Sequence, residues 1–180
     1  MKMATEKTVW VLDPTHSEIT FKVKHLMISN VKGEFKNFNV TVEGEDLESA
    51  KIKANIDTGS VFTNNTDRDN HLKGADFFDV ENHTEMTFEG TSFKKVDDDE
   101  YKLIGLLTIK GVTKEITFDV EFGGMNKDPW GNEKAGFSLE GKINRKEWGL
   151  NWNAALESGG VLVSEEVKLQ AEIQVVKQAA

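Results

Sequence analysis

Residues 64–80, NNTDRDNHLKGADFFDV, are the one segment that interrupts an otherwise almost continuous β pattern. Thr66 is suited to cap a short helix, residues 67–73 suffice for about two helical turns, and Gly74 is suited to the left-handed residue that ends it. This polar turn leads into two adjacent aromatic residues, Phe77 and Phe78. The segment therefore predicts a helical insertion near residues 66–73 that forms a lid over the edge or mouth of a β structure.

On both sides of the insertion, apolar and polar residues alternate, as in half-buried strands, and the alternation gives roughly eight to nine strands. An extra residue between Phe35 and Phe38 indicates a bulge. Short connections predict antiparallel neighbours. The clearest inward faces are Ile19, Phe21 and Val23; Leu103, Gly105, Leu107 and Ile109; Ile116, Phe118, Val120 and Phe122; Phe137, Leu139, Gly141 and Ile143; and Val167, Leu169, Ala171, Ile173 and Val175.

About eight antiparallel strands is the number at which closure removes sheet edges and leaves an interior that is just filled or holds one small ligand. We therefore expect an all-β antiparallel barrel. Inward glycines at Gly90, Gly105 and Gly141 indicate close approach of a ligand or backbone, or else bulges and barrel corners. Eleven phenylalanines and one tyrosine favour a long hydrocarbon guest, although a Phe-rich face is also typical of an ordinary core. Periodicity alone does not separate a hollow barrel from a filled one.

The 180 residues predict a single domain, 1–180, that needs no disulfide or metal to build its core. The chain has no cysteine, which excludes thiol catalysis and cysteine-ligated zinc. Its net charge of −9 argues against nucleic acid or an anionic membrane as a primary partner. The opening MKMATEKTVWVLD has no apolar leader and no later run reaches spanning length, so we expect a cytoplasmic protein without an integral membrane segment.

The sequence contains no motif for catalysis: no GxSxG elbow, no phosphate loop and no GxGxxG after a strand. His16 and Ser17 are neighbours on a strand and so face opposite sides. The four histidines are scattered, and only Asp67 and His71 have ligand spacing. We therefore expect no catalytic residue, no metal and no cofactor, and hydrogen-bonding or capping roles for the histidines.

A series of motifs extends along nearly the whole chain. In order they are WVLDPTHSEITF (10–21), VKHLMIS (23–29), VKGEFKNF (31–38), NIDTGSV (55–61), DRDNHLKGADFFDV (67–80), LIGLLTIKGVTKEITF (103–118) and INRKEWGL (143–150). On these motifs the chain resembles the YceI-like family, the lipocalin-like polyisoprenoid-binding proteins. The resemblance implies an elongated barrel whose apolar channel takes a polyprenyl or similar long-chain amphiphile without catalysis. It is also compatible with a homodimer.

Under this resemblance, the inward apolar residues are expected to line the channel. The predicted lining is Ile19, Phe21, Phe35, Phe38, Ile52, Phe88, Leu107, Ile109, Phe118, Phe137, Leu139 and Leu169, with Phe77 and Phe78 near the insertion. Candidate head-group or lid contacts are Arg68, Asp69, His71 and Arg145, since an arginine fork suits a phosphate. The structural alternative is that the first three pin the insertion against the barrel, and that Arg145 stacks or forms a buried ion pair.

The expected function is non-catalytic binding, sequestration or transport of a polyisoprenoid or other long-chain amphiphile. Two alternatives remain. A lipid- or isoprenoid-modifying enzyme would turn over its guest and would lose turnover on substitution of His71 or Arg68. A filled-barrel protein-interaction module would hold no hydrophobe and would have a defined protein partner.

Overall fold

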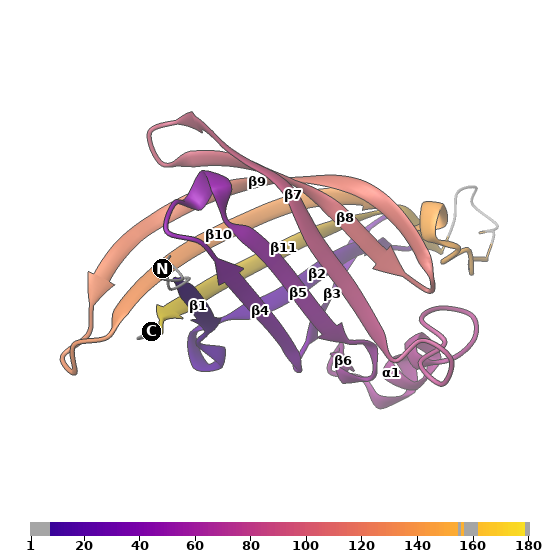
Figure 1. Ribbon diagram of the computed structural model, residues 1–180. Helices are drawn as coiled ribbons and strands as arrows, with labels where there is room; N and C mark the ends of the chain where they lie inside the picture. Colours follow the sequence, from indigo (N-terminus) through magenta and orange to yellow (C-terminus); the bar gives the residue numbers. More distant parts are fainter. Residues whose placement is uncertain (1–7, 155, 157–161, 179–180) are drawn as a thin grey trace.

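The computed structural model describes residues 8–154, 156 and 162–178, which form one twisted antiparallel sheet closed into a barrel (Figure 1). No helix in this part of the chain is long and apolar enough to cross a membrane. The elements are β1 (Val9–Leu12), η1 (Pro14–His16), β2 (Glu18–His25), β3 (Ser29–Phe35), β4 (Phe38–Glu43), η2 (Leu47–Ser49), β5 (Lys51–Asp57), η3 (Thr58–Ser60), β6 (Val61–Phe62), α1 (Thr66–Lys73), β7 (Glu85–Asp97), β8 (Glu100–Ile109), β9 (Val112–Lys127), β10 (Glu133–Asn144), η4 (Arg145–Trp148) and β11 (Val163–Lys177).

The described strands close a ring of eight in the order β1, β4, β5, β7, β8, β9, β10 and β11, because β1 pairs with both β4 and β11. β2, β3 and β6 extend the wall. β11 pairs with β1 at one end and with β2 along the rest, so β1 and β2 are two parts of one strand that bends at η1. In the same way, β3 and β4 are two parts of one wall strand, and β5 and β6 are two parts of another. The predicted antiparallel barrel of about eight strands is confirmed.

The prediction of a bulge between Phe35 and Phe38 is wrong. The strand is interrupted there instead. β3 ends at Phe35, and β4 begins at Phe38. The backbone of the two intervening residues bonds outside the regular ladder: Lys36 N–H donates to the carbonyl of Ser60, and the carbonyl of Asn37 accepts from Asp57. The wall bends at this point without an extra residue in a continuous strand.

The one α-helix among the described residues, α1, lies at the end of the barrel opposite β1 and the close of β11 (Figure 1). Its cap is Asn65 rather than the expected Thr66: the Asn65 side chain accepts a hydrogen bond from the backbone N–H of Arg68 at 3.0 Å. Asparagine is at least as good a cap as threonine, and Asn65 stands at the right distance from that N–H. Gly74 is not left-handed, with φ of −80°, because a tight bond from its N–H to the carbonyl of His71 ends the helix.

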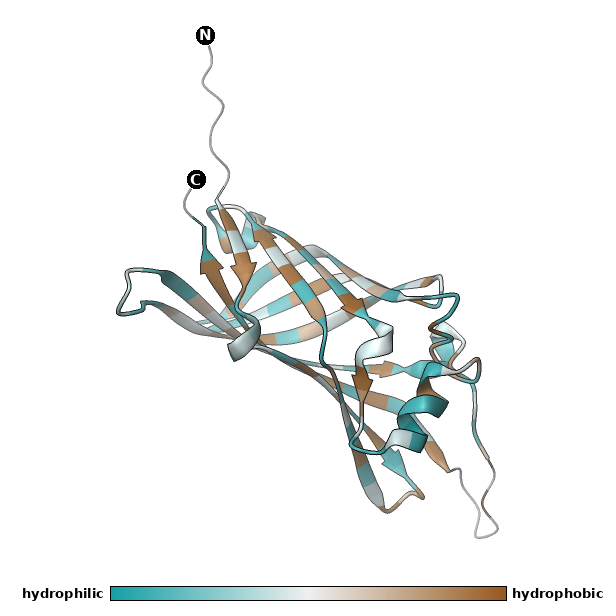
Figure 2. Ribbon diagram, turned by 90° about the horizontal axis from the view of Figure 1, so that it is seen from below, coloured by the Kyte–Doolittle hydropathy of each residue, from teal (hydrophilic) through white to brown (hydrophobic). Residues whose placement is uncertain are grey.

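One half of the barrel is filled. The stack of Phe93 on Tyr101 has ring centroids 4.7 Å apart, and that of Phe122 on Phe137 has centroids 5.2 Å apart. Trp10 is buried on β1 in the same core. Colouring by hydropathy shows hydrophobic and hydrophilic residues alternating along the strands (Figure 2). The aromatic rings thus close the interior at the end away from α1.

Two of the three inward glycines, Gly105 and Gly141, accommodate aromatic rings of neighbouring strands. A Cβ on Gly105 would lie 2.4 Å from Cζ of Phe88, and one on Gly141 would lie 2.8 Å from Cδ1 of Phe118. Among the alternatives expected for these two glycines, the close approach is to the protein itself. Of the three inward glycines, Gly90 is the one that adjoins a register shift in the described ladders. A large side chain at Gly105 or Gly141 would therefore disturb the wall before it filled the channel.

Gly105→Ala is expected to lower the free energy of unfolding by about 1–3 kcal/mol, the usual cost of overpacking. The new methyl would meet the Phe88 ring and also the carbonyl oxygen of Glu89, 2.6 Å from the ideal Cβ, and backbone cannot rotate away. Urea denaturation measures the change. Gly136→Ala is the matched control, since its Cβ would meet nothing within 4 Å. Equal stability of the two variants would contradict the packing argument.

The seam at which β1, β10 and β11 meet is held by Asp13. Its carboxylate accepts hydrogen bonds from Nδ1 of His16 at 2.9 Å, Nζ of Lys134 at 3.1 Å and Nε2 of Gln174 at 3.1 Å. Burial raises the pKa of Asp13, but hydrogen bonds from Thr15, His16 and Lys134 outweigh it and hold the pKa well below the ordinary 3.8. The ionised carboxylate therefore contributes to closure.

Asp13→Asn is expected to lower the free energy of unfolding at pH 7 by about 2–3 kcal/mol, because charge-assisted hydrogen bonds are lost. A folded-state pKa below the unfolded value means that this contribution is complete above pH 3.8 and is lost as the pH falls toward the folded value. The gap between the two proteins should therefore begin to narrow as the pH falls below 3.8, and most of it should remain at pH 3, because the folded-state pKa lies well below that pH. A series of urea titrations from pH 7 down to about pH 2 checks this. Asp119→Asn, at a side chain that is 70% exposed, is the control, and a gap as large at pH 2 as at pH 7 would refute the assignment.

Candidate functional site

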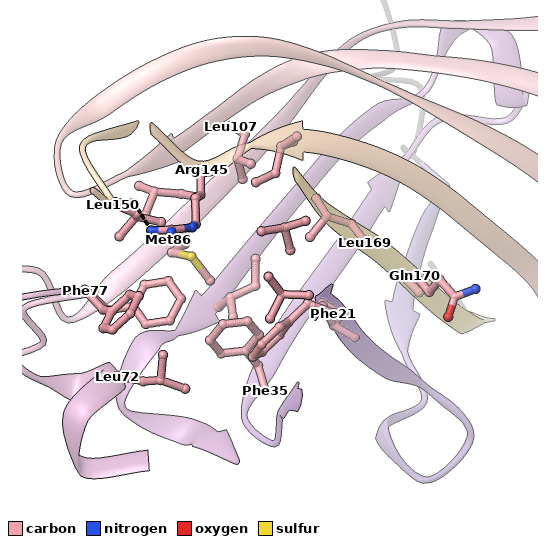
Figure 3. Close-up of a pocket in the computed structure, with 18 of the residues that line it drawn as sticks. Phe21, Phe35, Leu72, Phe77, Met86, Leu107, Arg145, Leu150, Leu169 and Gln170 are labelled. Atoms are coloured by element: carbon pink, nitrogen blue, oxygen red, sulfur yellow. Dashed lines mark hydrogen bonds between the residues drawn. The ribbon is translucent and has the colours of Figure 1, made fainter. Parts of the chain in front are cut away.

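The half of the barrel next to α1 is hollow, with a cavity of about 370 Å³ (Figure 3). Twelve of the fourteen apolar residues predicted to line a channel do line it. Whether they touch a guest stays a prediction. The twelve are Ile19, Phe21, Phe35, Ile52, Phe77, Phe78, Phe88, Leu107, Ile109, Phe118, Leu139 and Leu169.

The placement of Phe38 and Phe137 in the lining is wrong. Phe38 lies beyond the break in the β3–β4 wall and packs, half-buried, against the core. Phe137 is on the inward face of β10, but it stacks with Phe122 in the filled half. Alternation identifies the inward face of a strand, but it does not show at which level along the strand the cavity stops.

The cavity has a floor. The first lining residue along β8 is Leu103, and the first along β10 is Leu139. Two residues earlier in each strand, on the same inward face, are Tyr101 and Phe137, which pack with Phe93. The channel is therefore a blind apolar pocket whose inner end is aromatic and whose other end lies beneath α1.

Several lining residues were missed. Val23, Val167 and Ile173 share inward faces that the alternation identified, so the signal was present for them. Leu150 and Trp152 follow η4 in irregular structure, where no periodicity predicts a direction. Apart from Arg145, the lining residues between 145 and 163 could therefore not be predicted from the alternation of apolar and polar residues.

α1 is tied to the barrel through Thr63. Oδ1 of Asp69 accepts hydrogen bonds from the backbone N–H of Thr63 at 2.7 Å and from its hydroxyl at 2.6 Å. Arg68 donates from Nε to the same hydroxyl at 2.8 Å and from Nη2 to the Thr63 carbonyl at 2.7 Å. Asp69 is buried and does not reach the cavity, whereas Arg68 lines it. The pinning alternative thus describes the observed contacts of both residues.

His71 joins the insertion to the loop after η4. Its Nε2 lies 2.9 Å from Oδ2 of Asp76, and its ring meets Trp152 edge-on with centroids 4.7 Å apart. Phe77 packs against both rings, at 5.1 Å from His71 and 5.6 Å from Trp152. His71, Phe77 and Trp152 all line the cavity. Together they form a lid over the hollow half.

Arg145 is a buried cation in the cavity wall, 3% exposed. Its guanidinium donates to three carbonyls: Ser164 at 2.9 Å, Val163 at 3.2 Å and Leu150. Figure 3 shows the bond to Leu150. No carboxylate among the described residues lies within 4.0 Å of it, so the expected ion pair is not formed. Burial lowers the pKa of Arg145, and the more distant Glu165 partly offsets that effect.

The arrangement of the polar lining residues suits retention of a guest. Arg68, His71 and Arg145 each hold another part of the protein, as described above. In residues 8–154, 156 and 162–178, no group of three or more acidic or histidine side chains is placed to hold a metal ion. What remains at the site is an apolar pocket with a few cationic or polar groups near one end.

Comparison with known proteins gives consistent matches. A model of the YceI-like domain matches residues 10–175. A UPF0312 protein of Staphylococcus epidermidis is 46% identical over 170 residues, 93% of this chain and 96% of that protein. The YceI protein of Campylobacter jejuni has a TM-score of 0.75 and 36% identity, over 99% of this chain and all (100%) of that one. A polyisoprenoid binding domain from Saccharophagus degradans shares the fold, with a TM-score of 0.70 and 13% identity over 94% and 98% of the two chains.

Proposed function

The chain belongs to the YceI-like domain family, and on that premise we propose that it binds a polyisoprenoid or another long-chain amphiphile without transforming it. The name of the Saccharophagus degradans domain, which shares the fold, supports the guest class. The protein would sequester or carry the guest in the hollow half of the barrel.

The observation that carries this proposal is the blind apolar pocket. A hydrocarbon tail can enter toward the floor at Tyr101 and Phe137, where a polar head would find no partner among stacked rings. Each buried methylene contributes about 0.8 kcal/mol before ordering costs, so a long chain needs few polar contacts for retention. The depth of the floor would then limit the length of tail that fits.

Arg145 supports an anionic or strongly dipolar head. A buried guanidinium that faces only carbonyls keeps its full charge in an apolar wall, and a phosphate or carboxylate oxygen is its natural counter-ion. Arg68 lines the same cavity from α1. The head would therefore lie near the lid, with the tail directed at the floor.

The filled-barrel alternative is disfavoured by the 370 Å³ cavity. Catalysis has little support, because three of the polar lining side chains, Arg68, His71 and Arg145, are engaged in holding the wall and the lid. His71, the one histidine of the lid, is paired with Asp76 and packed against Trp152.

Organic extraction and mass spectrometry of protein purified from its own host test the proposal, together with native mass spectrometry of the intact protein. We expect one polyprenyl or acyl species per chain. The native mass also reports whether the homodimer expected from the sequence forms. A protein that carries no hydrophobe and takes up none when geranylgeranyl phosphate and fatty acids are offered would overturn the proposal.

A further inference from the structure

The turn between β2 and β3 combines two features that folding does not favour. Leu26 and Met27 have φ of 54° and 63°, and Ile28 N–H donates to the carbonyl of His25 at 3.2 Å. This is the geometry of a type I′ turn, in which asparagine and glycine are unstrained and branched or bulky residues are not. Strain retained in this way points to a role other than folding.

The same turn exposes its apolar side chains. Leu26, Met27 and Ile28 are 40%, 51% and 82% exposed. The turn also adjoins the cavity, because Leu26 N–H donates to the carbonyl of Leu162 at 2.9 Å, and Leu162 and His25 line the pocket. An apolar projection therefore stands at the rim through which a guest would pass.

A row of lysines crosses the outer wall beside this turn. In the ladder, Lys142 of β10 is opposite Lys168 of β11, Lys168 is opposite Lys22 of β2, and Lys22 is opposite Lys32 of β3. Like charges directly opposite one another destabilise a sheet. The inward residues on either side of Lys22, Phe21 and Val23, place the row on the outer face.

The positive charge of the row is only partly balanced: Glu34, Glu140 and Glu166 lie on the same outer face, two residues from Lys32, Lys142 and Lys168 along their strands. Among the described residues, Lys22, Lys32 and Lys168 have no carboxylate within 4.0 Å, and Lys142 has Glu166 at 3.9 Å. The net charge of −9 argues against attraction of the molecule as a whole to an anionic membrane, but the four adjacent lysines give one wall the opposite sign locally. Lys22 and Leu26 are four residues apart, about 13 Å along a strand, so the row and the turn can meet the same surface.

From the strained apolar turn and the lysine row we infer that this rim docks on an anionic lipid bilayer. Leu26, Met27 and Ile28 enter the interface, and the lysines face anionic headgroups. A bilayer offers hydrocarbon and negative charge together across one extended surface, which a nucleic acid does not. Passage of the guest from bilayer to pocket rests on the proposed function; docking itself does not.

Co-sedimentation of the full chain with vesicles tests the inference. We expect binding to phosphatidylcholine vesicles containing 30% phosphatidylglycerol, weakening as salt rises, and little binding to phosphatidylcholine alone. Leu26→Asn with Met27→Gly supplies the residues that the turn favours, so the fold is kept while two of the three inserting side chains are removed, and vesicle binding should weaken. The triple variant Lys22→Gln, Lys32→Gln and Lys168→Gln should lower the partition coefficient at least about tenfold.

The matched control is Lys51→Gln, Lys53→Gln and Lys94→Gln, three exposed lysines on β5 and β7 that change the net charge equally. The inference would be overturned if the control variant and the row variant lost vesicle binding equally. It would also be overturned if the wild-type protein did not bind anionic vesicles. If the protein bound duplex DNA as tightly as anionic vesicles, the lysine row would be a general site for polyanions, and the inference would again be overturned. Extraction of the guest is read separately: a loaded protein that does not dock refutes only the docking, whereas an empty protein that docks refutes only the guest.

Discussion

Ala171→Phe is expected to weaken binding of a long-chain guest by about 60-fold while leaving the barrel folded. Ala171 lines the pocket and is opposite Ile19 on β2 and Leu139 on β10, which line it too. A ring at this position occupies space otherwise available to the tail. If it displaces about three methylenes at about 0.8 kcal/mol each, the loss is about 2.4 kcal/mol, or about 60-fold in Kd. Titration with geranylgeranyl phosphate measures it.

The control for this variant is Glu172→Phe, the next residue on β11, which adds the same ring to the outer face of the sheet. The control should bind like the wild type. Thermal unfolding of both variants shows whether each is folded. A folded Ala171→Phe protein with unchanged affinity would mean that the guest does not occupy the hollow half.

The fold was predictable because each strand faces water on one side. Ile19, Phe21 and Val23 alternate with polar residues, and that period of two specifies both the strand and its inward face. β1 was missed as a separate element, because four residues are too few for alternation to be distinctive. The bends were missed too: η1, with Pro14 at its start, divides one wall strand in two.

The sequence could not predict how far the cavity extends along the barrel. Leu139 and Phe137 follow the same alternation, but only Leu139 lines the cavity. That difference depends on rings from other strands. Phe122 meets Phe137 across the β9–β10 ladder, and the Phe93–Tyr101 stack closes the same level. Packing between strands distant in sequence therefore decides whether an inward residue is wall or filling. The turn at Leu26 was likewise missed, because positive φ at a leucine has no sequence signature.

Arg145→Ala is expected to lower the free energy of unfolding by about 3–5 kcal/mol, the largest effect on stability among these substitutions. The guanidinium is 3% exposed and joins the start of η4 to Leu150 and to the first two residues of β11 through the carbonyls of Leu150, Val163 and Ser164. Its removal leaves three acceptors without that donor and leaves a void in the wall. Urea denaturation at pH 7 measures the loss.

Arg145→Lys separates the charge from the geometry. A lysine keeps the positive charge in the apolar wall, but a single ammonium cannot reproduce the planar fork that reaches three separate carbonyls. We expect it to recover part of the affinity for a phosphate-headed guest, but less than half of the lost stability. If lysine restored stability fully, the charge alone would hold the loop. If it restored no more binding than alanine in a folded protein, Arg145 would hold the wall and not the guest's head, and the head would then be assigned to Arg68 on α1.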